Sequence, residues 1–189
     1  MEYDQYIKGH KYTCYKRMVH DYGFMEYVAN NCDVTTLFRA INYLIGLPET
    51  HLEVLDYILL KLKERDIDSN PLYSSVISQL ILDILSLDNY VDLSDFTLSY
   101  LSLFFKHDYI TASKVRYFDD NPMTIFDVAI KYQNFKLINY IISLPGSDQS
   151  YLLERINNSL KQYDAIRETI ISKINPFNGS RKRSRYTLD

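Results

Sequence analysis

Apolar residues recur every three or four positions along most of the chain, which is the spacing of amphipathic helices. This spacing predicts helices over about 15–31, 35–44, 51–62, 71–87, 95–105, 124–132, 135–143 and 149–174, with a mixed loop or a short helix at 108–123. Between these segments stand helix-starting residues, such as Asn70 followed by Pro71. No stretch alternates apolar and polar residues as a half-buried strand does, so we expect an all-α fold.

Three of the predicted helix pairs share one pattern. Each first helix has a polar starting residue, a large apolar residue two positions on and a small residue five positions on. The three starting residues are Thr35, Asn70 and Thr124, and the small residues are Ala40, Ser75 and Ala129. A small side chain at that position lets a neighbouring helix approach closely. The second helices start at His51, Asp95 and Asn134 and again share their apolar positions.

This pattern resembles the ankyrin-repeat family, and the resemblance covers residues 34–148. The closest segment begins Thr124-Ile-Phe-Asp-Val-Ala-Ile130, where the family has T-P-L-H-x-A-A, and it continues with Asn134-Phe-Lys-Leu-Ile-Asn-Tyr-Ile141. Two features depart from the family. The first helices start 35 and 54 residues apart, against about 33 in the family, and its glycine between the helices is absent. A generic array of paired helices is the alternative interpretation.

The resemblance implies a short solenoid of stacked helix pairs with extra helices at both ends. We therefore divide the chain into a basic N-terminal segment and helix (1–33), ankyrin-like repeats (34–148), a C-terminal helix (149–177) and a basic, flexible tail (178–189). The long apolar segment from Ser74 to Asp95 is expected to extend the first helix of the second repeat. We expect one continuous core formed by Leu37, Ala40, Leu55, Ile58, Leu98, Leu101, Phe126, Ala129, Leu137 and Tyr140.

The net charge of −3 conceals two basic ends. Residues 8–20 and 176–186 each carry four Lys or Arg and no acidic residue, so the rest of the chain sums to −11. The candidate contacts to nucleic acid or to a partner are Lys8, His10, Lys11, Tyr12, Tyr15, Lys16, Arg17, Arg181, Lys182, Arg183 and Arg185. Basic residues interleaved with tyrosines suit RNA, but they also suit acidic proteins. A solvated helix face with a disordered tail is the simplest alternative.

No catalytic motif is present in the sequence. It contains no phosphate-binding glycine loop and no G-x-S-x-G, H-E-x-x-H or C-x-x-C. His10, Cys14, His20 and Cys32 are zinc-ligand types, but their order and spacing match no common zinc finger. We therefore expect no enzyme activity, no cofactor and no metal, and we interpret both cysteines as small core residues.

These observations favour a non-enzymatic adaptor or inhibitor that docks on a larger protein. The alternative is a factor bound to a ribonucleoprotein such as the ribosome and held by its two basic ends. The chain has no membrane-spanning run and no signal peptide, so we expect it in the cytoplasm or the nucleus, monomeric outside its complex. Its richness in Tyr, Ile, Asn and Lys is typical of AT-rich genomes, such as those of large DNA viruses and intracellular parasites.

Overall fold

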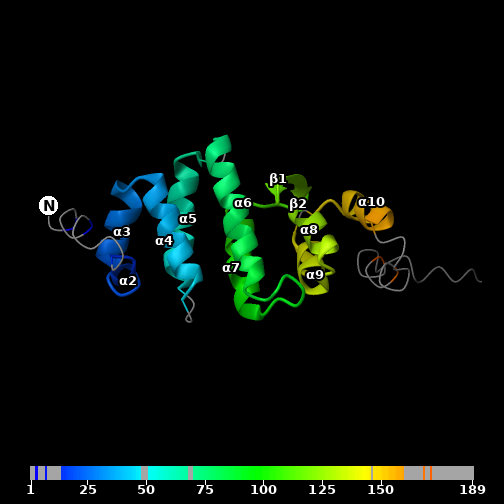
Figure 1. Cartoon of the computed structure of the whole chain (residues 1–189), viewed down its shortest axis with the longest axis horizontal. Helices are drawn as coiled ribbons and strands as arrows, with labels where there is room; N and C mark the ends of the chain where they lie inside the picture. Colours follow the sequence, from blue (N-terminus) through cyan, green and yellow to red (C-terminus); the bar gives the residue numbers. More distant parts are fainter. Residues whose placement is uncertain are drawn as a thin grey trace, which may run out of the picture.

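Paired helices lie side by side in an elongated array in the computed structural model (Figure 1). The structure describes Tyr3, Ile7, residues 14–47, 51–67, 70–145 and 147–159, Glu168 and Ile171. Its helices and strands are α2 (Cys14–Met18), α3 (Tyr22–Asn31), α4 (Val34–Ile45), α5 (Leu52–Glu64), α6 (Pro71–Ser86), α7 (Asp95–Lys106), β1 (Val115–Phe118), β2 (Asn121–Thr124), α8 (Ile125–Lys131), α9 (Phe135–Ser143) and α10 (Gln149–Ser159). The chain is therefore mostly helical, as predicted.

The helices form two rows. Consecutive helices contact each other within the pairs α2–α3, α4–α5, α6–α7 and α8–α9. In one row α4 contacts both α2 and α6, and α10 contacts α8; in the other row α5 contacts α3 and α7. The hairpin β1–β2 lies where the first row passes from α6 to α8, and β1 contacts both of these helices.

Side-chain caps explain where most helices begin. Asp33, Asn70 and Ser94 each accept a hydrogen bond from a backbone N–H in the first turn of the helix that follows. The sequence predicted helix starts at Asn70 and within two residues of Asp33 and Ser94. The predicted helix over 15–31, by contrast, is divided into α2 and α3, because Asp21 caps a new helix. In one continuous helix the spacing would place Tyr22 on the apolar face with Met18 and Met25, but Tyr22 is 69% exposed.

The hairpin corrects the prediction of a loop or short helix at 108–123. Its strands pair antiparallel, with Val115 opposite Thr124 and Phe118 opposite Asn121. The two-residue turn consists of Asp119 and Asp120, with φ of 49° and 62°. Such a turn needs positive φ at both positions, and Asp tolerates that conformation better than most residues. Four-residue strands are too short to show a clear alternation in the sequence.

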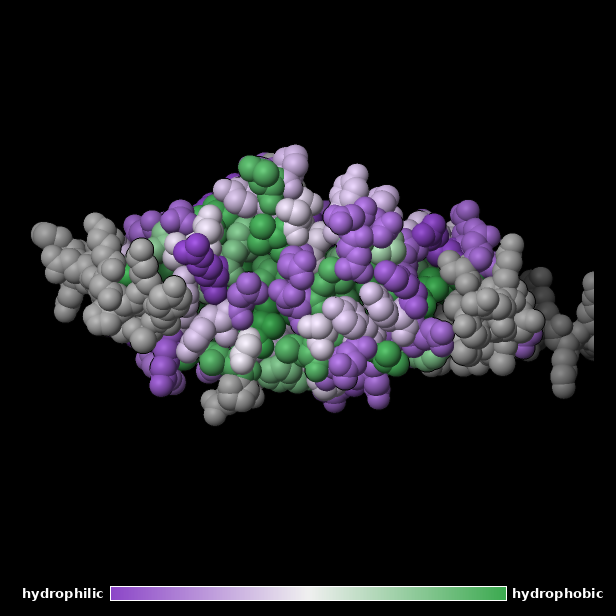
Figure 2. All heavy atoms as spheres, in the orientation of Figure 1, coloured by the Kyte–Doolittle hydropathy of each residue, from purple (hydrophilic) through white to green (hydrophobic). Residues whose placement is uncertain are grey.

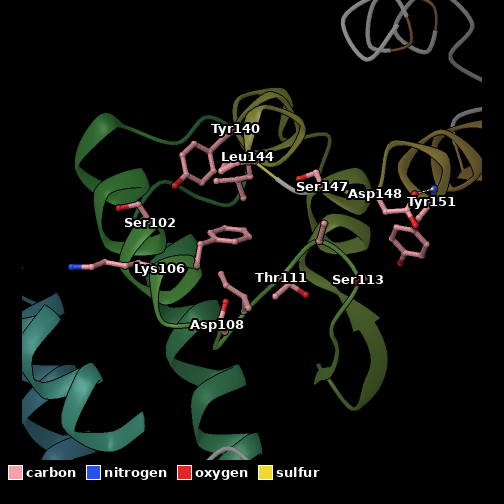
Figure 3. A pocket seen from close by; sticks show the side chains of 14 residues that line it. Ser102, Lys106, Asp108, Thr111, Ser113, Tyr140, Leu144, Ser147, Asp148 and Tyr151 are labelled. Carbon is pink, nitrogen blue, oxygen red and sulfur yellow. Dashed lines mark hydrogen bonds between the residues drawn. The ribbon is translucent and has the colours of Figure 1, made fainter. Parts of the chain in front are cut away.

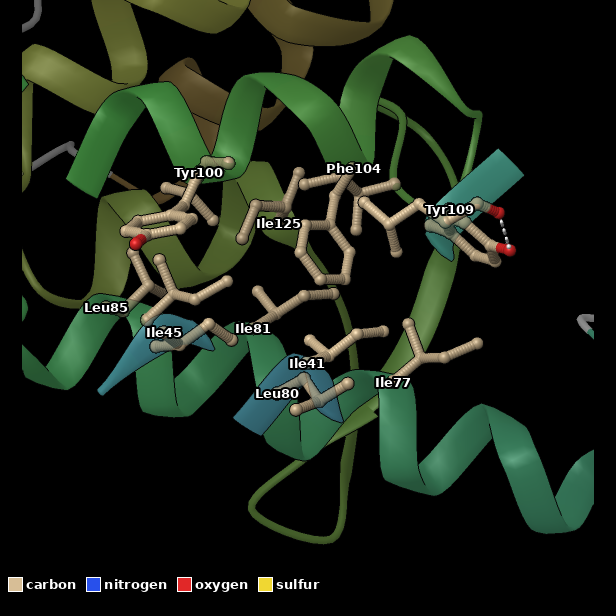
Figure 4. Close-up of a cluster of buried hydrophobic side chains, with 14 of the residues drawn as sticks. Ile41, Ile45, Ile77, Leu80, Ile81, Leu85, Tyr100, Phe104, Tyr109 and Ile125 are labelled. Atoms are coloured by element: carbon tan, nitrogen blue, oxygen red, sulfur yellow. Dashed lines mark hydrogen bonds between the residues drawn. The ribbon is translucent and has the colours of Figure 1, made fainter. Parts of the chain in front are cut away.

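The predicted core residues belong to one cluster. Eight of the ten are buried, while Leu98 and Tyr140 are partly buried and pack against the cluster. Two buried tyrosines also join neighbouring pairs (Figure 4). The Tyr100 hydroxyl donates to the carbonyl of Leu44 at 3.2 Å, and the Tyr109 hydroxyl donates to that of Leu59 at 2.9 Å. These bonds tie α7 and the loop after it to α4 and α5.

One part of the repeat alignment is wrong. α6 is long and buries its apolar stripe, as expected, but Leu72 is 75% exposed and Ser75 is also exposed. In the first and third segments the equivalent residues are buried: Leu37 with Ala40, and Phe126 with Ala129. α6 is therefore rotated about its axis relative to the predicted register, because Ile77, Leu80, Ile81, Ile84 and Leu85 form its larger apolar face.

The C-terminal helix is described only in part. α10 covers the beginning of the predicted 149–174 segment, and the tail 178–189 lies outside the described residues. In the part of the chain that the structure describes, no helix combines the length and the apolar character needed to cross a membrane.

Candidate interaction surface

One of the two lysine and arginine residues described near the N-terminus is engaged in the fold. Arg17 forms an ion pair with Asp21 at 2.8 Å, and its guanidinium carbon lies 5.0 Å from the ring centroid of Phe24. The hydrogen bond from the Phe24 N–H, followed by that from Arg17, lowers the pKa of Asp21. The Tyr15 ring lies 5.8 Å from that of Tyr43 and packs against the core. Lys16 remains exposed.

The other candidates in the basic ends lie outside the described residues. They are Lys8, His10, Lys11, Tyr12, Arg181, Lys182, Arg183 and Arg185. Cys32 is half-buried, and His20 is exposed. Within the described ranges, no group of three or more His, Cys, Asp or Glu side chains could hold a metal ion.

The hairpin presents three apolar side chains to solvent. Val115 and Tyr117 are 61% and 65% exposed, and both alternate with buried residues along β1. Pro122 lies opposite Tyr117 on β2 and is exposed as well. Residues directly opposite each other in a sheet share a face. We call Val115, Tyr117 and Pro122 the hairpin face.

A buried arginine fixes the hairpin to the array. Arg116 is 2% exposed and lies between the two outward-facing residues of β1. Its Nε donates to the carbonyl of Tyr109 at 2.7 Å, and its Nη1 donates to the Ser74 hydroxyl at 3.1 Å. Because both acceptors belong to other parts of the array, the hairpin face has a fixed position rather than that of a free loop.

α6 adds further exposed apolar residues beside this strand. Leu72 and Val76, one turn apart, are 75% and 37% exposed, and α6 contacts β1. Figure 2 shows hydrophobic atoms at the surface over the middle of the array, between more polar regions. This surface was not expected from the sequence, because the repeat pattern aligns Leu72 with the buried Leu37 and Phe126 and no strand was predicted.

A cavity of about 460 Å³ opens between α7, α9 and the start of α10 (Figure 3). We call it the α7–α9 cavity. It is lined by Ser102, Phe105, Lys106, Asp108, Ile110, Thr111, Ala112, Ser113, Tyr140, Leu144, Pro145, Ser147, Asp148 and Tyr151. The two loops that follow α7 and α9 supply most of these residues, and the first of them leads directly into β1.

Aromatic rings and hydroxyls dominate the lining of this cavity. The rings of Phe105 and Tyr140 meet edge to face, with centroids 5.6 Å apart. Burial raises the pKa of Tyr140, although its hydrogen bond with the Ser102 side chain acts in the opposite direction. The hydroxyls of Tyr140 and Ser102 are therefore neutral near pH 7, and they are suited to hydrogen bonding rather than to acid–base chemistry.

Comparison with known proteins identifies no relative. No family model, no curated protein and no solved structure matches this chain. Its function must therefore be inferred from the surfaces just described.

Proposed function

We propose that this protein is a non-enzymatic adaptor or inhibitor that docks on a larger protein. The hairpin face is the observation that carries the proposal. Two large apolar side chains, Val115 and Tyr117, stand in solvent on a strand that the buried Arg116 holds in place. Exposed aromatic residues on a rigid support are typical of the anchors that dominate protein–protein binding.

The architecture supports this proposal. An ankyrin repeat consists of a β-turn followed by two helices, and β1–β2 followed by α8 and α9 has that order. Thr124 starts α8 with a reciprocal capping box: its hydroxyl accepts from the Asp127 N–H, and the Asp127 carboxylate accepts from the Thr124 N–H. Stacked repeats are extended scaffolds that usually bind macromolecules through such exposed surfaces.

A photo-crosslinking experiment tests the proposal. A benzophenone amino acid at position 117 of the full chain is irradiated in extract from the native cell, with and without nuclease. We expect a crosslinked protein that nuclease treatment does not remove. The variant Val115→Thr, with the benzophenone still at 117, should reduce the crosslink, because it removes apolar contact and keeps a β-branched residue in the strand.

Val91→Thr is the matched control. Val91 is 55% exposed in the turn before α7, so the same substitution there changes the surface without touching the hairpin face. A crosslink that Val91→Thr reduces as much as Val115→Thr would contradict docking through the hairpin face. The absence of any protein crosslink in all variants would refute the adaptor function itself.

A further inference from the structure

We infer that the α7–α9 cavity receives a lysine or arginine side chain of the partner protein. This inference rests on the proposed function and specifies the chemistry of the partner as a basic segment. The cavity volume of about 460 Å³ falls within the range of about 300–1,000 Å³ that is common for ligand sites. The cavity is therefore large enough for a long side chain of the partner together with the adjoining backbone of the partner.

Two carboxylates provide the negative charge at the cavity. No described hydrogen bond or ion pair engages the exposed Asp108 carboxylate, while the Asp108 carbonyl already accepts a bond from the Lys114 ammonium at 2.9 Å. Asp148 accepts hydrogen bonds from the N–H groups of Ser150 and Tyr151 at 3.0 and 3.1 Å. These bonds fix its carboxylate at the start of α10.

The lysine in the lining does not compete for this site. The Lys106 ammonium forms an ion pair with Asp56 on α5 at 2.6 Å. Figure 3 shows its side chain extending away from the other labelled residues of the cavity. Its charge is therefore balanced outside the cavity. The Lys114 ammonium at the Asp108 carbonyl offsets part of the negative charge there, and Asp108 and Asp148 together still leave a net negative charge for an incoming cation.

Aromatic walls and overall charge favour the same occupant. Tyr140 and Tyr151 line the cavity, and a cation over an aromatic face is attracted by the ring. Hydroxyl groups such as Thr111 can accept hydrogen bonds from an ammonium or a guanidinium. Outside the basic segments 8–20 and 176–186, the residues carry a net charge of −11. Such a charge attracts basic partners over a distance.

Fluorescence anisotropy with defined peptides tests the inference on the full chain. The probes are fluorescein-labelled dodecapeptides in which Gly alternates with Arg, Lys, Gln or Glu. We expect the Arg and Lys peptides to bind at least tenfold more tightly than the Gln peptide, and the Glu peptide to bind least. Amide NMR shifts caused by the Arg peptide should be largest around the cavity, at residues such as Thr111 and Ser147.

The double variant Asp108→Asn/Asp148→Asn isolates the two carboxylates. Asn tolerates the positive φ of 56° at position 108 and caps helices as well as Asp does, so the fold should be kept. Affinity for the Arg peptide should fall at least fivefold. Asp92→Asn/Asp120→Asn is the matched control, since it removes two exposed charges elsewhere and should change affinity less than twofold.

Several results would overturn the inference. They are equal affinity for the Arg and Glu peptides, an equal loss of affinity in the control variant, or the largest NMR shifts away from the cavity. A fourth is movement of the cavity's amide NMR signals when Arg181, Lys182, Arg183 and Arg185 are replaced by Gln without any peptide present, because the occupant would then be the chain's own tail. Any of these, combined with an intact crosslink from position 117, would leave the adaptor function standing.

Discussion

Arg155 on α10 binds the carboxylate of Asp127, which also completes the cap of α8. Its Nε lies 2.7 Å from Oδ1 of Asp127, and its Nη2 contacts the same oxygen. The other oxygen of Asp127 accepts from the N–H and the hydroxyl of Thr124, both at 2.9 Å. One carboxylate therefore both completes the cap of α8 and fixes α10 to that helix.

Arg155→Gln should release α10 while leaving the other helices in place. The capping box survives, so we expect the unfolding free energy to fall by only about 1 kcal/mol. Amide hydrogen exchange should accelerate over residues 152–156 and stay unchanged in α4. Lys136→Gln is the control, because its partner Asp95 is 95% exposed, and it should cost almost nothing. Unchanged exchange in α10 would show that Arg155 does not hold it.

Asp56 should make stability depend on pH at the junction of α5 and α7. Burial alone would raise its pKa, but hydrogen bonds from Lys106 and His107 outweigh burial and hold the pKa below its ordinary value of 3.8. A lowered pKa in the folded state stabilises the fold above pH 3.8, and this contribution disappears as the pH falls through the lowered value.

Asp56→Asn should therefore lower the unfolding free energy at pH 7 by about 0.5–1 kcal/mol. The difference from the original protein should vanish in urea unfolding once the pH lies well below the lowered pKa of Asp56. The exposed Asp92→Asn serves as the control and should show no difference at either pH. A difference for Asp56→Asn that persists at low pH would mean that its ionisation is not the cause.

Enlarging Ala129 should disturb the core, whereas enlarging Ser75 should not. Ala129 is 1% exposed on α8, so Ala129→Leu should cost about 1–3 kcal/mol through overpacking. Ser75→Leu, on the exposed face of α6, should change stability by no more than about 0.5 kcal/mol. Thermal unfolding measures both. Equal costs would contradict the rotation of α6 seen here.

The basic ends remain the basis of the ribonucleoprotein alternative. Reversing the charges of Lys8, Lys11 and Lys16 tests it without touching Arg17, which the fold uses. If RNA is bound there, affinity should fall and its salt dependence should become weaker, since each phosphate contact contributes to that slope. Replacing Arg181, Lys182, Arg183 and Arg185 by Gln tests the other end. Ribosome binding by both variants at the level of the original chain would exclude the basic ends as a nucleic-acid site.

Local signals in the sequence were enough to predict much of the fold. Apolar stripes and caps such as Asn70 identified the helix pairs, because both depend on residues close together in the chain. The exposure of Leu72 was not predictable from the repeat pattern, since it depends on how α6 packs against the rest of the array. The α7–α9 cavity depends on where two helices separate, and the bond between Arg155 and Asp127 spans 28 residues. Neither leaves a pattern in the sequence.

Pro122 gives the exposed hairpin a protection that its apolar face alone would not suggest. In a hairpin with a two-residue turn, the pair that flanks the turn is hydrogen-bonded, so Pro122, opposite Tyr117, falls at the next, non-bonded position. Its missing N–H therefore costs the ladder nothing and removes a donor from the outer edge of β2. α6 contacts the neighbouring strand β1. A strand from another molecule therefore cannot form a complete set of backbone hydrogen bonds with the hairpin. The apolar side chains of the hairpin face can stay exposed without promoting the formation of fibrils.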